Sequence, residues 1–131
     1  MSRASVEKLR ALAGTRILGT SDFRGDDEAK VAPKDWLDVA RVLRDELAFD
    51  RFLDLTAVDY PERESGRFDV VLRVRSSVTR SRIALRAEVD EDASIASVTS
   101  IWSGAGWAER EVFDMFGVGF DGHPDLRRIL M

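Results

Sequence analysis

The densest group of ionisable side chains lies near the end of the sequence. Glu109, Arg110, Glu111 and Asp114 fall within six residues, and His123 follows within the next ten. Three carboxylates and a histidine invite an acid–base interpretation, with Glu109 or Glu111 as the base and His123 as the acid. The neighbouring arginine favours ionised carboxylates, however, rather than a base that titrates near neutrality. No nucleophile elbow, phosphate loop or metal-binding motif accompanies the group, so a structural role is favoured over a free-standing hydrolase.

A helix is predicted to carry this group over residues 106–116, with Gly117 as its end. At about 100° per residue, two arcs of the helix can be separated. The polar arc contains Trp107, Arg110, Glu111 and Asp114, and the apolar arc contains Ala108, Val112, Phe113, Met115 and Phe116. Glu109 falls inside the apolar arc, where a carboxylate is costly unless it is paired or lies at a helix N-terminus. We therefore predict that helix-start N–H groups or an arginine hold Glu109, with Arg127 or Arg128 as the candidate arginines.

The loop after this helix contains the single histidine of the chain. An Asp-Gly turn precedes His123, and Pro124 forces the residue before it into an extended conformation. We predict that His123 orients the loop through a hydrogen bond. The sequence ends on three apolar residues, which indicates docking on the domain, burial in a partner, or a chain cut short of its natural length. Residues 118–131 are therefore predicted to be a C-terminal extension that contacts a partner.

Five arginines occur within fourteen residues that contain no acid. They are Arg73, Arg75, Arg80, Arg82 and Arg86. Four of them point away from the apolar faces of their predicted strands, which suggests docking onto an acidic partner or a phosphate backbone. The alternative interpretation is a solvated sheet face that simply needs polar residues. Because aromatic stacking residues are absent from that face, the solvated face is favoured over a nucleic-acid site.

Length and composition exclude several classes of protein. A chain of 131 residues accommodates one domain. The net charge of −4 provides no global attraction to nucleic acid or anionic lipid. Without cysteine and with one histidine, disulfides, thiolate nucleophiles, cysteine-bound clusters and His-rich metal sites are excluded. The uncharged stretch 93–108 is too short and polar to span a bilayer, and the N-terminus lacks a signal-peptide core, so a cytoplasmic location is expected.

Hydrophobic spacing predicts a single α+β domain over residues 1–131. Helices are predicted at 5–13 and 34–47 as well as at 106–116, and in the second of these Trp36, Ala40, Leu43 and Leu47 form one stripe. Five strands are predicted at residues 16–20, 28–32, 52–60, 68–75 and 82–89, and Ser97 is predicted to cap a short turn. The order α-β-β-α-β-β-β-α with a coil tail predicts a two-layer sandwich. Its sheet is mostly antiparallel, has about five strands and carries helices on one face.

Several segments together resemble a known family. Residues 109–117 (EREVFDMFG), Phe120 and residues 122–131 (GHPDLRRILM) closely resemble the signature of the 30 kDa subunit family of respiratory complex I, the proton-pumping NADH–quinone oxidoreductase. Similar family stretches match LTAVDYPER at 55–63, FDVV at 68–71 and SVTSIW at 97–102. The resemblance covers residues 34–131. The first thirty residues carry no matching motif, and family chains usually continue past the RILM stretch with a further tail.

The resemblance implies a non-catalytic assembly subunit of the peripheral arm, on the cytoplasmic face of the bacterial inner membrane or the matrix side in mitochondria. It implies no cofactor in this chain, because NADH, FMN, iron–sulfur clusters and quinone belong to other subunits of the complex. The implied partners are the subunits that hold the terminal cluster and the quinone site, with no nucleic acid and no membrane span. Glu109, Arg110, Glu111 and Asp114 would form a structural and docking helix, and residues 123–128 would guide the chain toward the quinone-site subunit.

Other hypotheses remain at the level of the sequence. Related membrane hydrogenases and F420H2 or plastid-type dehydrogenases carry similar subunits, so the resemblance identifies the role better than the electron donor. A small nucleic-acid-binding domain that uses the arginine-rich face is the alternative from a different class.

Overall fold

A computed structural model describes residues 3–23 and 26–124 of the chain. Within these residues the helices are α1 (Arg3–Ala13), α2 (Trp36–Arg41) and α3 (Ala105–Phe116), with shorter windings η1 (Gly14–Arg16), η2 (Pro33–Asp35) and η3 (Val42–Glu46). The strands are β1 (Ile17–Phe23), β2 (Asp26–Val31), β3 (Arg51–Asp59), β4 (Phe68–Arg75), β5 (Arg82–Val89), β6 (Ser94–Ala96) and β7 (Gly119–Asp121). The predicted α+β class is confirmed, and so is the order of its main elements.

Five strands form one sheet in the order β1-β2-β5-β4-β3. The pairs β1–β2, β3–β4 and β4–β5 are antiparallel, whereas β2 and β5 are parallel, so the sheet is mixed. Strands β6 and β7 form a separate parallel pair. The prediction had a coil in place of these last two strands, because three residues are too few to show an alternating pattern.

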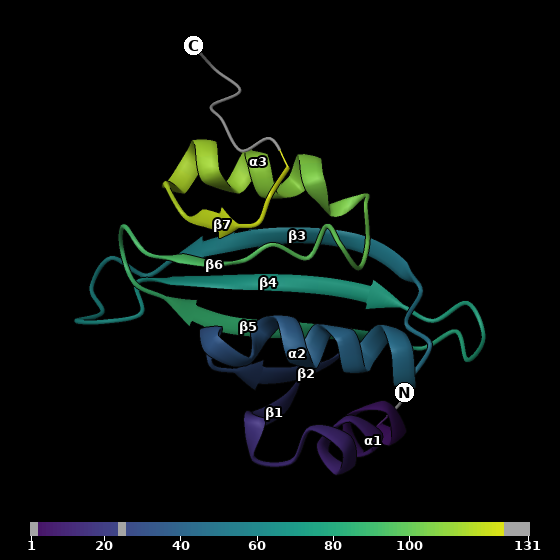
Figure 1. The fold of residues 1–131 in the computed structure, drawn as a ribbon. Helices are drawn as coiled ribbons and strands as arrows, with labels where there is room; N and C mark the ends of the chain where they lie inside the picture. The colour runs from purple at the N-terminus through teal and green to yellow at the C-terminus, as the bar shows by residue number, and fades with distance from the viewer. Residues whose placement is uncertain (1–2, 24–25, 125–131) are drawn as a thin grey trace.

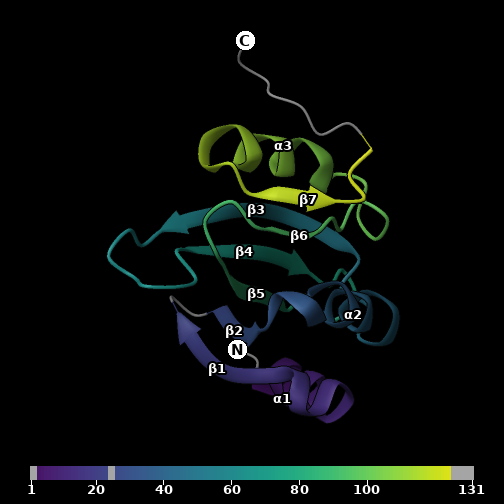
Figure 2. The same ribbon diagram turned by 60° about the vertical axis from the view of Figure 1, so that its left-hand side comes forward.

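One face of the sheet packs against the helices and the other carries charged side chains. In β4, Phe68, Val70, Leu72 and Val74 alternate along the strand and are buried in the core. Helix α2 lies in front of the sheet, α3 runs beside β3 at one edge and α1 lies beside β1 and β2 at the other, as Figures 1 and 2 show. The two-layer arrangement follows from this alternation, since only one face of each strand needs a covering layer.

The helix predicted at residues 34–47 consists of three windings, η2, α2 and η3. Its predicted stripe is confirmed, because Trp36, Ala40 and Leu43 are fully buried and Leu47 packs against them. The last winding is a π turn in which the N–H of Leu47 donates to the carbonyl of Val42. Ala48, with a φ of 62°, then ends the helix and turns the chain toward β3.

Candidate functional site

Helix α3 and the loop after it carry the ionisable group near the end of the chain, and α3 lies beside β3 (Figure 1). The helix starts one residue earlier than predicted and ends at Gly117, as predicted. Gly117 has a φ of 77°, a left-handed conformation that glycine adopts without steric cost. Its N–H donates to the carbonyl of Phe113. The chain then reverses into β7, which pairs with β6 and brings the loop that contains His123 next to α3.

The carboxylate of Glu109 is completely buried, with 0% of its side chain exposed. Its Oε1 accepts a hydrogen bond from Ser97 Oγ at 2.7 Å, and its Oε2 accepts one from the backbone N–H of Val98 at 2.8 Å. Val98 begins the turn before α3, since its carbonyl accepts the N–H groups of Ile101 and Trp102. Burial raises the pKa of Glu109, and the bonds from Val98 and Ser97 act in the opposite direction.

The N–H group that holds Glu109 therefore belongs to a neighbouring turn and not to the start of α3, which the prediction named. Glu109 lies in the second turn of α3, and the first N–H groups of the helix are one turn away along the chain. Ser97 caps the turn as predicted, because its Oγ accepts the N–H of Thr99 at 3.1 Å. Arg127 and Arg128, the other candidate partners, lie outside the described residues.

His123 fastens the loop to α3. Its side chain is 2% exposed, and Nε2 donates a hydrogen bond of 2.9 Å to the carbonyl oxygen of Gly106 in the first turn of the helix. The same nitrogen lies 3.9 Å from Oε1 of Glu109. This is the loop-orienting hydrogen bond that was predicted for His123. Pro124 follows directly and is exposed.

The outward side of α3 is partly apolar. Trp107 is 56% exposed and Met115 is 72% exposed, with the exposed Glu111 between them. The guanidinium of Arg110 lies over the Trp107 ring at 5.3 Å, and Asp114 is half-buried. The assignment of Met115 to the buried arc was wrong. Met115 lies at the border of that arc beside Glu111, too far around the helix to reach the sheet.

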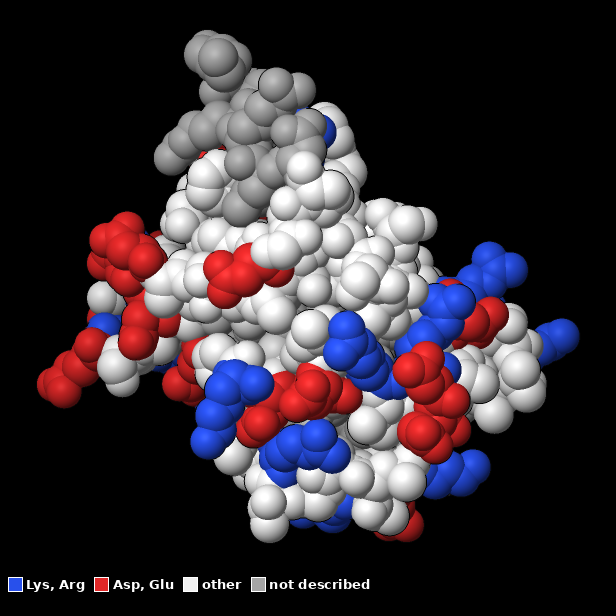
Figure 3. Space-filling model, viewed as in Figure 1, with Lys and Arg blue, Asp and Glu red and all other residues white. Residues whose placement is uncertain are grey.

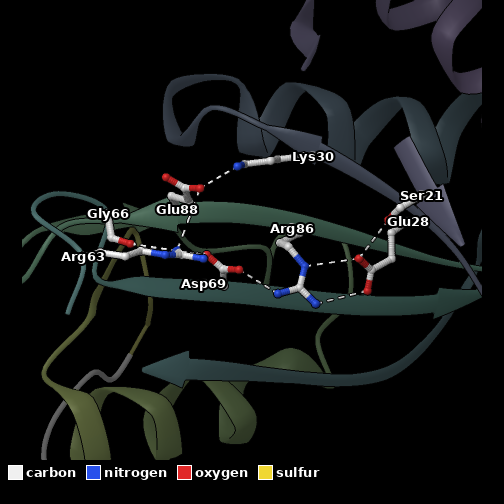
Figure 4. A network of polar contacts seen from close by, with 8 residues as sticks. All are labelled: Ser21, Glu28, Lys30, Arg63, Gly66, Asp69, Arg86 and Glu88. Atoms are coloured by element: carbon white, nitrogen blue, oxygen red, sulfur yellow. Dashed lines mark hydrogen bonds and ion pairs between the residues drawn. The ribbon is translucent and has the colours of Figure 1, made fainter. Parts of the chain in front are cut away.

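A network of hydrogen bonds and ion pairs crosses β1, β2, β5 and β4 on the opposite face of the sheet (Figure 4). It consists of Ser21, Glu28, Lys30, Arg63, Asp69, Arg86 and Glu88. At its centre, Arg86 on β5 bonds Glu28 on β2 at 3.2 Å and Asp69 on β4 at 2.7 Å. Burial disfavours the charge of Arg86, but these bonds outweigh that effect and raise its pKa. The network therefore ties β2, β5 and β4 together across the parallel pair.

The five arginines of the sequence pattern do not form one uniform positive patch. Arg86 belongs to the network, Arg73 pairs with Asp54 at 3.3 Å, and Arg82 pairs with Asp26 at 3.2 Å. These carboxylates come from strands outside the acid-free stretch, so sequence proximity gave no sign of them. The paired guanidinium groups weigh against the nucleic-acid hypothesis, which needs arginines free to meet phosphates.

Sequence reasoning also missed partners that lie far apart along the chain. Ser97 and Val98 were assigned to a turn without any link to Glu109, and Asp69 was assigned only to a strand. Asp69 is nearly buried and accepts from both Arg63 and Arg86. Its position opposite Glu88 becomes evident only from the β4–β5 register, so the sequence carried no signal for it.

Neither a membrane-spanning helix nor a metal-binding cluster is found in the part of the chain that the structure describes. None of the helices there is long and apolar enough to cross a bilayer. The same residues contain no group of three or more His, Cys, Asp or Glu side chains placed to hold a metal ion.

Comparisons with known proteins agree on one family. Residues 29–131 match the family model described as the respiratory-chain NADH dehydrogenase, 30 Kd subunit. The C subunit of the NADH-quinone oxidoreductase of Roseiflexus sp. (strain RS-1) is 50% identical over 96% of this chain and 74% of its own length. The corresponding C subunit of Geobacter sulfurreducens is 42% identical over 97% of this chain and 79% of its own length.

Solved structures show the same fold. A trypsin-resistant fragment of Nqo5 has a TM-score of 0.78 and 28% identity, over 95% of this chain and 98% of the fragment. A chain of the archaeal membrane-bound sulfane sulfur reductase has a TM-score of 0.81 at 22% identity, over 98% of this chain and 75% of that chain.

Proposed function

Because the chain belongs to the family of the 30 kDa subunit of the respiratory-chain NADH dehydrogenase, we propose that it is a non-catalytic structural subunit of an NADH–quinone oxidoreductase. In this proposal it belongs to the peripheral arm, on the cytoplasmic face of the bacterial inner membrane. It braces the subunits that carry the terminal iron–sulfur cluster and the quinone site. NADH, FMN, the clusters and quinone are bound by those other subunits.

The geometry of Glu109 and His123 is the observation that carries the proposal. Both oxygens of the Glu109 carboxylate accept hydrogen bonds from the turn before α3, and the carboxylate is closed off from solvent. His123 uses its Nε2 to hold the backbone of the same helix. Two residues that could act as base and acid are thus occupied in joining the turn, the helix and the last loop. This arrangement supports a role in shaping a surface rather than in transforming a substrate.

The outward side of α3 supports contact with another protein. Trp107 and Met115 are large apolar side chains that remain exposed on a domain of this size. Aromatic residues and methionine are enriched at protein interfaces, where they bury much area at small entropic cost. Helix α3 also lies next to the loop of His123, whose Nε2 bonds the backbone of the helix. We therefore assign this side of α3 to a neighbouring subunit of the peripheral arm.

Isolation of the complex through an affinity tag on this chain tests the proposal. We expect subunits that contain iron–sulfur clusters, and the quinone-site subunit, to co-purify with the tagged chain. The double variant Trp107→Ser/Met115→Ser should recover less of these subunits, because it removes the exposed apolar contacts of α3. Leu18→Ser is the matched control, since Leu18 is similarly exposed on β1. A tagged chain that is recovered without any cofactor-bearing subunit would contradict the proposed role.

A further inference from the structure

Three arginines lie directly side by side across one end of the charged face of the sheet. Arg51 on β3 is opposite Arg75 on β4, and Arg75 is opposite Arg82 on β5. Neighbouring strands are about 4.8 Å apart, so the three side chains project close together from the same face of the sheet. We call these residues the arginine row. Like charges at directly opposite positions destabilise a sheet, so the row has an electrostatic cost in the isolated chain.

Two members of the row lack an ion pair within the described residues. Arg82 pairs with Asp26, but no carboxylate lies within ion-pair distance of Arg51 or Arg75 among residues 3–23 and 26–124. Asp50, directly before Arg51, accepts hydrogen bonds from the N–H and hydroxyl of a serine in the β4–β5 hairpin, and its charge interaction with Arg51 is weaker than these bonds. Asp54 is paired with an arginine further along the face. Two guanidinium groups without an ion pair to any described residue are therefore concentrated at this end of the sheet.

The hairpin beside the row is held firmly and adds another arginine. The hydroxyl of Ser76 accepts the N–H groups of Val78 and Thr79, and the N–H of Arg80 donates to the carbonyl of Ser76. Arg80 is exposed and has a φ of 62°, a left-handed conformation that is uncommon outside glycine. Lys and Arg side chains project at the right-hand edge of the molecule, where Figure 1 shows this hairpin, while Asp and Glu gather at the left-hand edge (Figure 3).

We propose that the arginine row, together with Arg80, is a docking surface for an acidic segment of a partner polypeptide. Guanidinium groups pair with carboxylates in a planar, two-point geometry, and the other arginines of this face already bind carboxylates. A segment with carboxylates at strand or helix spacing would both neutralise the row and remove its internal repulsion. The absence of aromatic side chains from the row favours a protein partner over a single-stranded nucleic acid.

A binding assay with the purified chain tests the charge complementarity. The probe is a fluorescent oligoglutamate peptide, titrated at low and high salt. We expect Arg51→Glu/Arg75→Glu to weaken binding about tenfold at low salt, with the difference shrinking as salt screens the charges. The control Arg10→Glu/Arg41→Glu changes the net charge equally on the exposed surfaces of α1 and α2, and should weaken binding by less than about twofold.

The folding of the variants is checked with Arg75→Gln. Because this substitution removes the middle charge of the row, the melting temperature should stay the same or rise. If Arg51→Glu/Arg75→Glu fails to fold, Arg51→Gln/Arg75→Gln replaces it in the binding assay. The proposal is overturned if the control pair weakens binding as much as the row variant, or if the unmodified chain does not bind oligoglutamate. Stronger row-dependent binding to oligothymidylate, or to phosphatidylglycerol vesicles, would also overturn it in favour of nucleic acid or lipid.

The inference rests on the proposed role in a multisubunit complex, and the same variants separate the two. With the tagged chain, Arg51→Glu/Arg75→Glu should lose its cofactor-bearing partners at a lower salt concentration than Arg10→Glu/Arg41→Glu. If the unmodified chain recovers those partners and the row variant retains them at every salt concentration, the docking surface is refuted and the structural role stands. If the unmodified chain recovers none of them, the structural role itself fails.

Discussion

Replacing Glu109 by glutamine isolates the effect of burying a titratable carboxyl group. The amide has the shape of the carboxyl group, and its oxygen can still accept the N–H of Val98. Its NH2 group can donate to Ser97 Oγ, which in turn can donate to Thr99 Oγ1 at 2.9 Å. Glu109→Gln therefore keeps the hydrogen bonds and removes only the ability to ionise.

The sign of the pH dependence follows from the direction of the pKa shift. Burial raises the pKa of Glu109 in the folded chain above its ordinary value of 4.5, so the folded state binds the proton more tightly than the unfolded state. The free energy of unfolding of the unmodified chain should then decrease as pH rises from about 4.5 to the folded pKa, by up to about 1.4 kcal/mol for each pH unit in that window. Glu109→Gln lacks this loss, so its stability relative to the unmodified chain should increase over the same window.

Urea denaturation followed by tryptophan fluorescence, repeated from acidic to neutral pH, measures this difference. The control is Glu111→Gln, an exposed position on the same helix, whose effect should stay within about 0.5 kcal/mol at every pH. A difference between Glu109→Gln and the unmodified chain that stays constant with pH, or that falls as pH rises, would refute the reasoning. In that case the bonds from the turn before α3 would outweigh the cost of burial.

Three further predictions concern the fold, and each is measured as a change in the free energy of unfolding in urea. Arg86→Met should lower the free energy of unfolding by about 2–3 kcal/mol, because it leaves two nearly buried carboxylates without their shared partner. The control Arg73→Met breaks an exposed pair and should cost less than about 1 kcal/mol. Equal costs would contradict a central role for Arg86. Gly117→Ala should cost about 1 kcal/mol through the positive φ alone, since a β carbon there meets no atom within 4 Å. The control Gly19→Ala should be close to neutral, because Gly19 has equally open space and no positive φ. Trp102→Phe should cost about 1–3 kcal/mol because a buried backbone carbonyl loses its Nε1–H donor, and an unchanged stability would show that this bond contributes nothing net.

Patterns with a short period could be predicted from the sequence. The alternation of apolar residues in β4 and β5, and the stripe from Trp36 to Leu43, identified both the elements and their buried faces. Gly117 marked the end of α3 because a left-handed residue is a local requirement. The family resemblance rested on long continuous motifs in the second half of the chain, and the comparisons confirm it.

Contacts between distant residues were beyond this kind of reasoning. The parallel pairing of β2 with β5, and the partners of Glu109 and Arg86, depend on which segments meet in space. The arginines illustrate the difficulty well. Sequence spacing placed them on one face, but only the strand register distinguishes Arg73, which faces a carboxylate, from Arg75, which lies between two other arginines.

The parallel pairing of β2 with β5 also bears on the order in which the chain can fold. Strand β3 pairs with β4, and β4 pairs with β5, so these three can associate through contacts between consecutive segments. The β1–β2 hairpin leaves the ribosome before them, yet its place in the sheet exists only after β5 has been synthesised and has paired. We expect the N-terminal hairpin to join the sheet late, so that an incomplete chain exposes the open edge of β2 until β5 has been synthesised and has paired.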